Sequence, residues 1–239
     1  MKTRPPRALL LDLDDTILVY GPLGDEVWQS VTEHFAPLLG LEAGALLAAV
    51  DEAASRYWAP PERSRLGRHD LRGARRTICL WALQALGAPH PERGAAMADA
   101  FHDEREARVE PLPGAFDALE HFRTRGIPLV MVTNGGPELQ RRKIERFQLA
   151  GFFEAILVEG ELGFGKPDPR VYGQALAAVD VAPSHAWMVG DNLTADIQGA
   201  QSAGLHACWV DAPGQGTDKV SRIRPTATIQ ALAELIDWV

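Results

Sequence analysis

The stretch Leu9-Leu10-Leu11-Asp12-Leu13-Asp14-Asp15-Thr16-Ile17 begins as an apolar run and ends among three carboxylates. The run starts at Ala8 and is short and apolar on both faces, which favours a strand of a parallel sheet covered by helices. Because side chains alternate along a strand, Asp12 and Asp14 are expected on the same side of it. Carboxylates packed at the end of a buried strand need a cation or several donors nearby. The alternative is a strand-ending turn that happens to be rich in Asp.

Four more short apolar runs follow, separated by segments with helical period. We expect this alternation to form a doubly wound α/β domain. Asp168 and Pro169 suit the start of one helix, as cap and first residue. An apolar stripe from Ile229 to Ile236 predicts a last helix. The predicted strands are Ala8–Leu13, Ile127–Thr133, Ala155–Glu159, Ala186–Gly190 and Leu205–Val210.

One connection is far too long for an ordinary crossover between strands. More than a hundred residues separate the first two apolar runs, and their periodicity is helical throughout. We therefore expect residues 19–109 to form an inserted α-helical cap domain. Residues 1–18 and 110–239 are expected to form a Rossmann-like core.

Composition excludes several classes of protein. A formal charge of −8 works against binding to phosphate backbones, so nucleic acid is not an expected partner. Two cysteines, Cys79 and Cys208, cannot build a disulfide framework, which fits a reducing cytoplasm. The first apolar run meets Asp12 too early for a signal peptide or a membrane span, and no membrane partner is expected. The sequence predicts no particular oligomeric state.

Three further segments place polar residues after predicted strands. Thr133-Asn134-Gly135 is a strand end and tight turn before a helix, which can offer a hydroxyl and N–H groups to an anion, although a plain turn would look the same. Lys166 lies in a loop of glycines and prolines that can aim its ammonium group, although such lysines are usually solvated. Asp191 ends another apolar run, and Asp196 follows near a helix start, where it could serve the helix alone.

Taken together, these side chains are expected at one crevice. In a doubly wound sheet, ligands bind beyond the carboxyl ends of the strands, where the strand order reverses. Four carboxylates and one ammonium would give this crevice a charge of −4 + 1 = −3 before any anion binds. All-oxygen ligands point to a hard cation, and Mg²⁺ suits a site that also meets a phosphate. The converging residues are Asp12, Asp14, Thr133, Lys166, Asp191 and Asp196.

The ordered set Asp12-x-Asp14-x-Thr16, Thr133, Lys166 and Gly190-Asp191-x-x-x-x-Asp196 resembles the four motifs of the haloacid dehalogenase superfamily. The resemblance spans nearly the whole chain and is to the branch with a helical cap after the first strand. More finely, the segments around these motifs are similar to the subgroup of pyrimidine 5′-nucleotidases and N-acylneuraminate 9-phosphatase. Asp15 stands where much of the superfamily has Gly, and we interpret it as a tolerated turn residue.

The resemblance implies a phosphatase that hydrolyses phosphoric monoesters through an aspartyl-phosphate. Asp12 would be the nucleophile, and Asp14 the general acid and base. Thr133, the Asn134 backbone N–H and Lys166 would bind the phosphoryl oxygens and stabilise the developing charge. Mg²⁺ would be held by Asp12, the Asp14 carbonyl and Asp191, with Asp196 ligating directly or through water.

Other functions share this set of residues. A haloacid dehalogenase uses the same nucleophile on carbon but needs neither Mg²⁺ nor Asp14, whose presence weighs against it. A phosphomutase differs in whether the cap admits water or a second hydroxyl. A phospho-receiver signalling module has similar acidic residues but its acceptor Asp on a middle strand and no such insert. A catalytically dead binding protein is disfavoured because every motif position is filled.

The expected substrate is a small phosphorylated metabolite, either a nucleotide, a sugar phosphate or a small phospho-acid. The residues that select the substrate are expected in the insert, which can close and exclude water. A basic cluster there could contact a second anionic group or simply be a solvated helix face. The cluster comprises Arg65, Arg68, His69, Arg72, Arg75 and Arg76.

Overall fold

A computed structural model of the protein describes residues 5–212 and 222–238. The chain forms two compact units, Tyr20–Val109 and the remainder, up to Val19 and from Glu110 onward. The chain leaves the larger unit at Val19 and returns to it at Glu110, and these two points are neighbours. The Val19 N–H donates to the Glu110 carbonyl at 2.9 Å, and Leu18 pairs antiparallel with Pro111.

The larger unit is built on a parallel sheet, which in the described part of the chain has six strands in the order β3-β2-β1-β4-β5-β6. The chain starts in the middle, fills one side and then crosses to the other, as a doubly wound sheet does. The order therefore reverses beside β1. The strands are β1 (Ala8–Leu11), β2 (Leu129–Thr133), β3 (Ala155–Val158), β4 (Ala186–Gly190), β5 (His206–Val210) and β6 (Ala227–Ile229).

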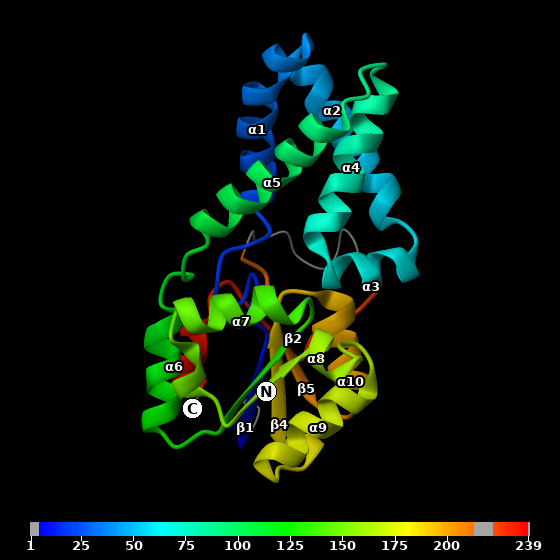
Figure 1. Cartoon of the computed structure of the whole chain (residues 1–239). Coiled ribbons are helices and arrows are strands. Elements are labelled where there is room, and N and C mark those ends of the chain that lie inside the picture. The colour runs from blue at the N-terminus through cyan, green and yellow to red at the C-terminus, as the bar shows by residue number, and fades with distance from the viewer. Residues whose placement is uncertain (1–4, 213–221, 239) are drawn as a thin grey trace. The chain divides into compact units, whose positions relative to one another are not determined.

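Helices cover both faces of this sheet (Figure 1). On one face Leu10, Val130 and Met188 pack with Tyr172 of α9 and Ile197 into a single buried cluster. The other face carries α6, which contacts the C-terminal 3₁₀ segment η5. Burial on both faces explains why the strands lack polar alternation. The helical segments of this unit are α6 (Ala115–Thr124), α7 (Pro137–Arg146), η1 (Leu149–Phe152), α8 (Glu159–Leu162), α9 (Pro169–Val179), η2 (Pro183–His185), η3 (Leu193–Gln198), α10 (Gly199–Ser202) and η5 (Leu232–Trp238).

The predicted doubly wound fold is confirmed, with corrections at its edges. All five predicted strands form, but the first ends at Leu11, so Asp12 already lies in the following loop. A sixth strand, β6, was not predicted, and Ile229 belongs to it rather than to a last helix. The predicted helix is the 3₁₀ segment η5. Three residues of strand are too few for a periodic signal, and only pairing with β5 defines them.

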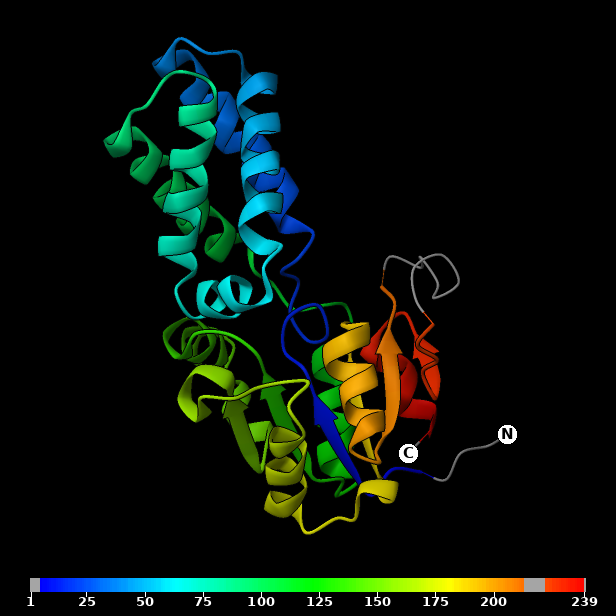
Figure 2. The same ribbon diagram turned by 90° about the vertical axis from the view of Figure 1, so that its right-hand side faces the viewer.

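The smaller unit contains only helices in its described secondary structure, and Figure 2 shows them lying side by side. Its core is a cluster of buried apolar side chains around Val31, Leu83 and Phe101, and Trp28 stacks on Phe101. This core gives the unit its own source of stability. Its helices are α1 (Leu23–Leu39), α2 (Ala43–Trp58), α3 (Pro61–His69), α4 (Leu71–Ala85) and α5 (Pro91–Arg108).

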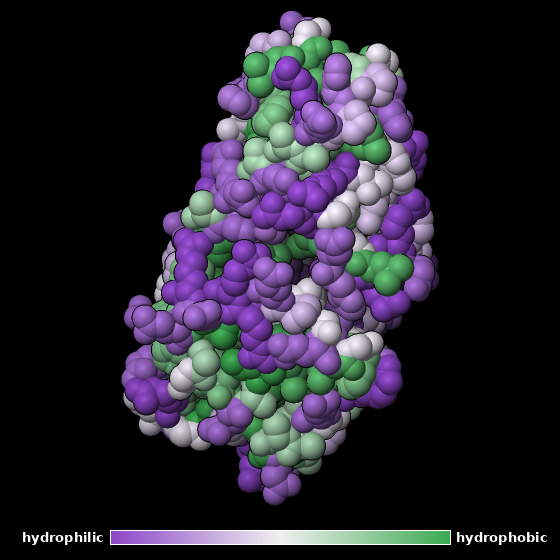
Figure 3. All heavy atoms as spheres, viewed as in Figure 1, coloured by the Kyte–Doolittle hydropathy of each residue, from purple (hydrophilic) through white to green (hydrophobic). Residues whose placement is uncertain are grey.

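The basic cluster of the helical unit does not form one uniform face. Arg72 and Arg76 both pair with Asp99, whereas Arg75 is 3% exposed and contacts His102 at 2.6 Å. Hydrophilic side chains cover most of the surface visible in Figure 3, with apolar ones interspersed. Ion pairs of Arg65, Arg72 and Arg76 thus occur in the same cluster as one buried arginine, Arg75.

Within residues 5–212 and 222–238, no helix by itself combines the length and apolar character of a membrane span. Only α1 and α2 taken together, bent by 118°, satisfy length and composition.

Candidate active site

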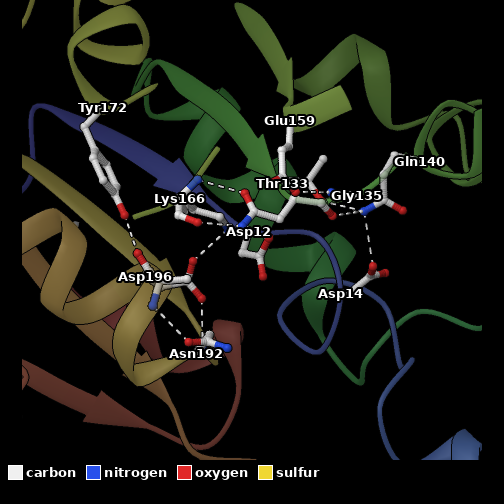
Figure 4. Close-up of polar contacts among 12 residues, drawn as sticks. Asp12, Asp14, Thr133, Gly135, Gln140, Glu159, Lys166, Tyr172, Asn192 and Asp196 are labelled. Atoms are coloured by element: carbon white, nitrogen blue, oxygen red, sulfur yellow. Dashed lines mark hydrogen bonds and ion pairs between the residues drawn. The ribbon is translucent and has the colours of Figure 1, made fainter. Parts of the chain in front are cut away.

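The predicted site residues lie where the carboxyl ends of the central strands meet, and Figure 4 shows Asp12, Asp14, Thr133, Lys166 and Asp196 there. Asp12 directly follows β1, Thr133 is the last residue of β2, and Asp191 directly follows β4. Lys166 comes from the loop between α8 and α9. Because β1 neighbours both β2 and β4, residues far apart in sequence are adjacent here.

Lys166 joins two of the carboxylates. Its Nζ lies 2.7 Å from Oδ1 of Asp12 and 2.7 Å from Oδ1 of Asp196. All three residues are buried, and Asp196 is 0% exposed. Burial by itself lowers the pKa of Lys166, but the charges of Asp12 and Asp196 outweigh it and raise that pKa overall. The charged form of Lys166 is therefore favoured, and its ammonium group is fixed beside Asp12.

The Asn134 side chain holds Lys166 in place. Its Nδ2 donates to the Lys166 carbonyl at 2.7 Å, and the Lys166 N–H donates to its Oδ1 at 2.8 Å. Gly165 makes this approach possible, because a Cβ there would lie 2.5 Å from Asn134 Oδ1. The loop is thus aimed by a side-chain clamp as well as by its prolines and glycines.

Asp196 is positioned by a short π-helical segment, η3. Its Oδ2 accepts from the backbone N–H of Asn192 at 2.9 Å, and the Asn192 side chain in turn caps the backbone N–H groups of Thr194 and Ala195. A Cβ on Gly190 would lie 2.3 Å from the Asp196 carboxyl carbon. Glycine at 190 is therefore required for Asp196 to reach Lys166.

Three carboxylates form a possible cation site. Asp12, Asp191 and Asp196 each offer an oxygen, and these oxygens lie within 4.8 Å of one another. Burial, reinforced by the neighbouring carboxylates, raises the pKa of Asp12 to about 7 and that of Asp191 to about 9. One ammonium group, Lys166, cannot offset three ionised carboxylates. An all-oxygen donor set with excess negative charge fits a hard divalent cation such as Mg²⁺.

Asp14 lies in a separate polar group. Lys143 Nζ contacts both of its carboxylate oxygens, at 2.7 and 2.8 Å, and Gln140 Nε2 donates to Oδ2 at 3.2 Å. Neither Lys143 nor Gln140 was among the predicted site residues. The sequence of their segment, Pro137–Arg146, is typical of a charged surface helix. Only the three-residue spacing of Gln140 and Lys143, which places both on one face of a helix, pointed to a shared role.

The turn after β2 offers fewer donors than predicted. The Gly135 N–H donates to Oε2 of Glu159 at 3.0 Å, so that donor is already used. Glu159 is 4% exposed, follows β3 and was predicted only as a strand end. Thr133 is buried, and its Oγ1 accepts from Gln140 Nε2 at 2.6 Å. The predicted phosphate contacts of Thr133 and the Asn134 N–H stay predictions.

Asp15 occupies the left-handed region, with a φ of 57°. Its N–H donates to the Leu18 carbonyl at 2.6 Å, which closes a tight turn directly after Asp14. This conformation favours glycine but tolerates Asp. The interpretation of Asp15 as a turn residue agrees with this geometry.

Residues 6–204 match the family model of the haloacid dehalogenase-like hydrolases. The phosphoserine phosphatase of Thermus thermophilus is 38% identical over 235 residues, covering 86% of this chain and 88% of the relative. The magnesium-bound structure of the putative hydrolase YfnB from Bacillus subtilis has a TM-score of 0.75 at 26% identity, with 98% of each chain covered. The 2-haloacid dehalogenase of Pseudomonas syringae has a TM-score of 0.63 at 28% identity, covering 97% of this chain and 96% of its own. The sheet order, the four motifs and the family match lead to one conclusion: this chain belongs to the haloacid dehalogenase-like hydrolases.

Proposed function

We propose that the protein is a Mg²⁺-dependent phosphatase that hydrolyses a small phosphorylated metabolite through an aspartyl-phosphate. The observation that carries this proposal is the position of Lys166, 2.7 Å from both Asp12 and Asp196, beside the three-carboxylate cluster. A carboxylate nucleophile next to fixed positive charge is what an incoming phosphoryl group needs.

In the first step, an Asp12 carboxylate oxygen attacks phosphorus and the bond to the leaving alkoxide breaks. Asp14 gives its proton to that alkoxide. In the second step, Asp14 takes a proton from water as the water attacks phosphorus, which releases phosphate and restores the Asp12 carboxylate. Lys166 and the Thr133 hydroxyl would stabilise the charge on the other phosphoryl oxygens in both steps.

The cation would be held by the carboxylates of Asp12 and Asp191 and by the Asp14 backbone carbonyl. Mg²⁺ would supply positive charge that offsets the charge of the phosphoryl group. Oδ2 of Asp196 accepts from the Asn192 N–H, and Oδ1 forms an ion pair with Lys166. This supports a role for Asp196 through water, or through Lys166, rather than as a direct ligand.

Substrate choice is proposed to lie in the inserted helical domain of residues 19–109, most of which forms the separate unit Tyr20–Val109. The relative named phosphoserine phosphatase, which covers 86% of this chain, supports a small phospho-acid. The finer resemblance to pyrimidine 5′-nucleotidases supports a nucleotide instead. A phosphate-release screen should therefore include both phospho-acids and nucleotides.

A dehalogenase is the second candidate, because a 2-haloacid dehalogenase is a structural neighbour at 28% identity. Asp14 and the cation-binding cluster argue against it, since attack on carbon with loss of halide needs no proton donor and no Mg²⁺.

The decisive experiment is a phosphate-release screen over phosphoserine, nucleoside monophosphates and sugar phosphates, with Asp12→Asn as the blank. We expect phosphate release that needs Mg²⁺ and stops with a chelator. The same protein is assayed for halide release from 2-haloacids and for isomer formation from sugar phosphates. If no ester is cleaved faster than in the blank, the proposal is wrong, and stoichiometric labelling without turnover would indicate a signalling module.

A further inference from the structure

Helix α7 brings two buried polar side chains to the site from outside the four motifs. Gln140 is 2% exposed and Lys143 is 3% exposed, and they lie on one face of the helix, one turn apart. Both face Asp14, more than a hundred residues earlier in the chain. Other charged residues of α7, such as Arg141 and Arg142, pair at the surface with Glu161 and Glu138.

The Lys143 contact fixes the position of the Asp14 carboxyl group. Nζ lies 2.7 Å from Oδ1 and 2.8 Å from Oδ2, so both oxygens are held by one ammonium group. The Asp14 side chain is 23% exposed, whereas that of Lys143 is 3% exposed. The carboxyl group therefore keeps an open side towards solvent while its other side is fixed by the helix.

Gln140 links Asp14 to the phosphate-binding turn. Its Nε2 lies 2.6 Å from Thr133 Oγ1, and 3.2 Å from both Asp14 Oδ2 and the Asn134 carbonyl (Figure 4). A carboxylate and a carbonyl can only accept, so the amide nitrogen must face them. The Thr133 oxygen then accepts from Gln140, and its own hydrogen can be donated to a further acceptor.

Folding alone gives little reason for such a pair. The buried ammonium group of Lys143 loses its hydration and the Asp14 carboxylate loses part of its own, and apolar residues of similar volume often serve stability as well or better. The adjacent Ile144, also buried, shows that this helix has apolar packing available. Polar groups buried at this cost, and aimed at two residues of the mechanism, suggest a functional reason.

We infer that Gln140 and Lys143 are positioning residues of the phosphatase reaction. Lys143 holds the Asp14 carboxyl group where it can serve the leaving group, and Gln140 orients the Thr133 hydroxyl as a donor to the phosphoryl group. This inference rests on the proposed function. Because Lys143 contacts both oxygens, one can stay held while the other gives its proton to the leaving alkoxide as the phosphorus–oxygen bond breaks.

The test compares two kinds of phosphate ester in Lys143→Met. An alkyl phosphate, the one that the wild-type protein cleaves fastest, needs a proton on its leaving group, but p-nitrophenyl phosphate does not. We expect kcat for the alkyl ester to fall on the order of 100-fold, with KM changed less than about threefold. The first turnover of p-nitrophenyl phosphate, seen as a burst of nitrophenolate, should fall less than about fivefold, because its leaving group departs without a proton.

Gln140→Leu should behave differently. Thr133 is expected to touch the phosphoryl group whichever alcohol leaves, so both esters should slow by a similar factor, roughly 10-fold. Arg141→Met is the matched control, since it removes an ion pair from the exposed side of the same helix and should leave both esters at the wild-type rate. Thermal unfolding of each variant separates loss of fold from loss of positioning.

An equal fall for both esters in Lys143→Met, or no fall, would overturn the inference for Lys143. If that variant does not fold, Lys143→Gln keeps a donor without the charge and is read in the same way. Lys143→Arg should recover part of the alkyl-ester rate. A wild-type protein that cleaves no ester would instead refute the proposed function itself.

Discussion

Lys166 and Lys143 are both buried ammonium groups paired with carboxylates, yet they hold the two halves of the site in different ways. Lys166 lies in a clamped loop and contacts Asp12 and Asp196, which are themselves buried. Lys143 lies within a helix and contacts Asp14, which is partly exposed. The half that bears the proposed nucleophile is therefore enclosed and fixed, whereas the half proposed to transfer the proton can still reach solvent.

The largest expected effect is on catalysis. Asp12→Asn should lower kcat by on the order of 10⁴-fold or more, because no other group can form the intermediate. Asp14→Asn should cost about 10²- to 10⁴-fold, the usual contribution of a general acid and base. Steady-state phosphate release measures both. A larger loss in Asp14→Asn than in Asp12→Asn would contradict the division of the site into a nucleophile half and a proton-transfer half.

The next effect is on stability. Lys166→Met leaves two buried carboxylates without their cation and should lower the free energy of unfolding by about 3–5 kcal/mol. Lys143→Met should cost less, about 1–2 kcal/mol, since Asp14 can be solvated. Urea denaturation in a chelator gives both values. A larger loss for Lys143→Met would show that the two pairs are buried alike.

A smaller effect is expected at Gly190. Gly190→Ala puts a Cβ against the Asp196 carboxyl group and should cost about 1–3 kcal/mol through overpacking. Gly173→Ala is the control: Gly173 is exposed on α9, no atom lies within 4 Å of its Cβ position, and alanine there should stabilise slightly. If Gly190→Ala is tolerated as well as the control, Asp196 is not held as tightly as its contacts indicate.

A further effect concerns pH. Burial raises the pKa of Asp191 to about 9, far above its value in the unfolded chain, so the folded protein keeps a proton that the unfolded chain has lost. This contribution to stability is present at low pH and is lost as the pH rises towards 9. Without metal, the melting temperature should fall by a few degrees more between pH 6 and 9 than in Asp191→Asn. Added Mg²⁺ should reduce that fall, and a pH-independent difference between the two proteins would contradict the assignment.

The sequence was sufficient for the elements that depend on local pattern. Short apolar runs predicted five strands, and Asp168 caps α9 as expected, accepting from the Arg170 N–H. Lys166 was predicted because glycines and prolines set it apart from ordinary surface lysines. Lys143 was not, because in a helix of Glu, Arg and Lys nothing local distinguishes a buried ammonium from a solvated one. Its role is decided by Asp14, which only the folded sheet brings near.

The same reasoning explains the other corrections. The sequence predicted Glu159 only as the end of a strand. Its carboxylate has a structural role because it accepts from the Gly135 N–H of a neighbouring loop, which the sequence does not reveal. The strand β6 depends on pairing with β5 rather than on its own three residues. Long-range contacts, rather than composition or period, define each of these features.

The hydrogen bond between Val19 and Glu110 has a consequence for how this protein can change. Entry and exit of the helical segment lie side by side, so a short turn could bridge them with little entropic cost. The helical segment can therefore be shortened, exchanged or grafted without altering the order of the strands in the sheet. Under the proposed function, selection for a new ester could change the helical segment while the acidic residues and both lysines stay in place.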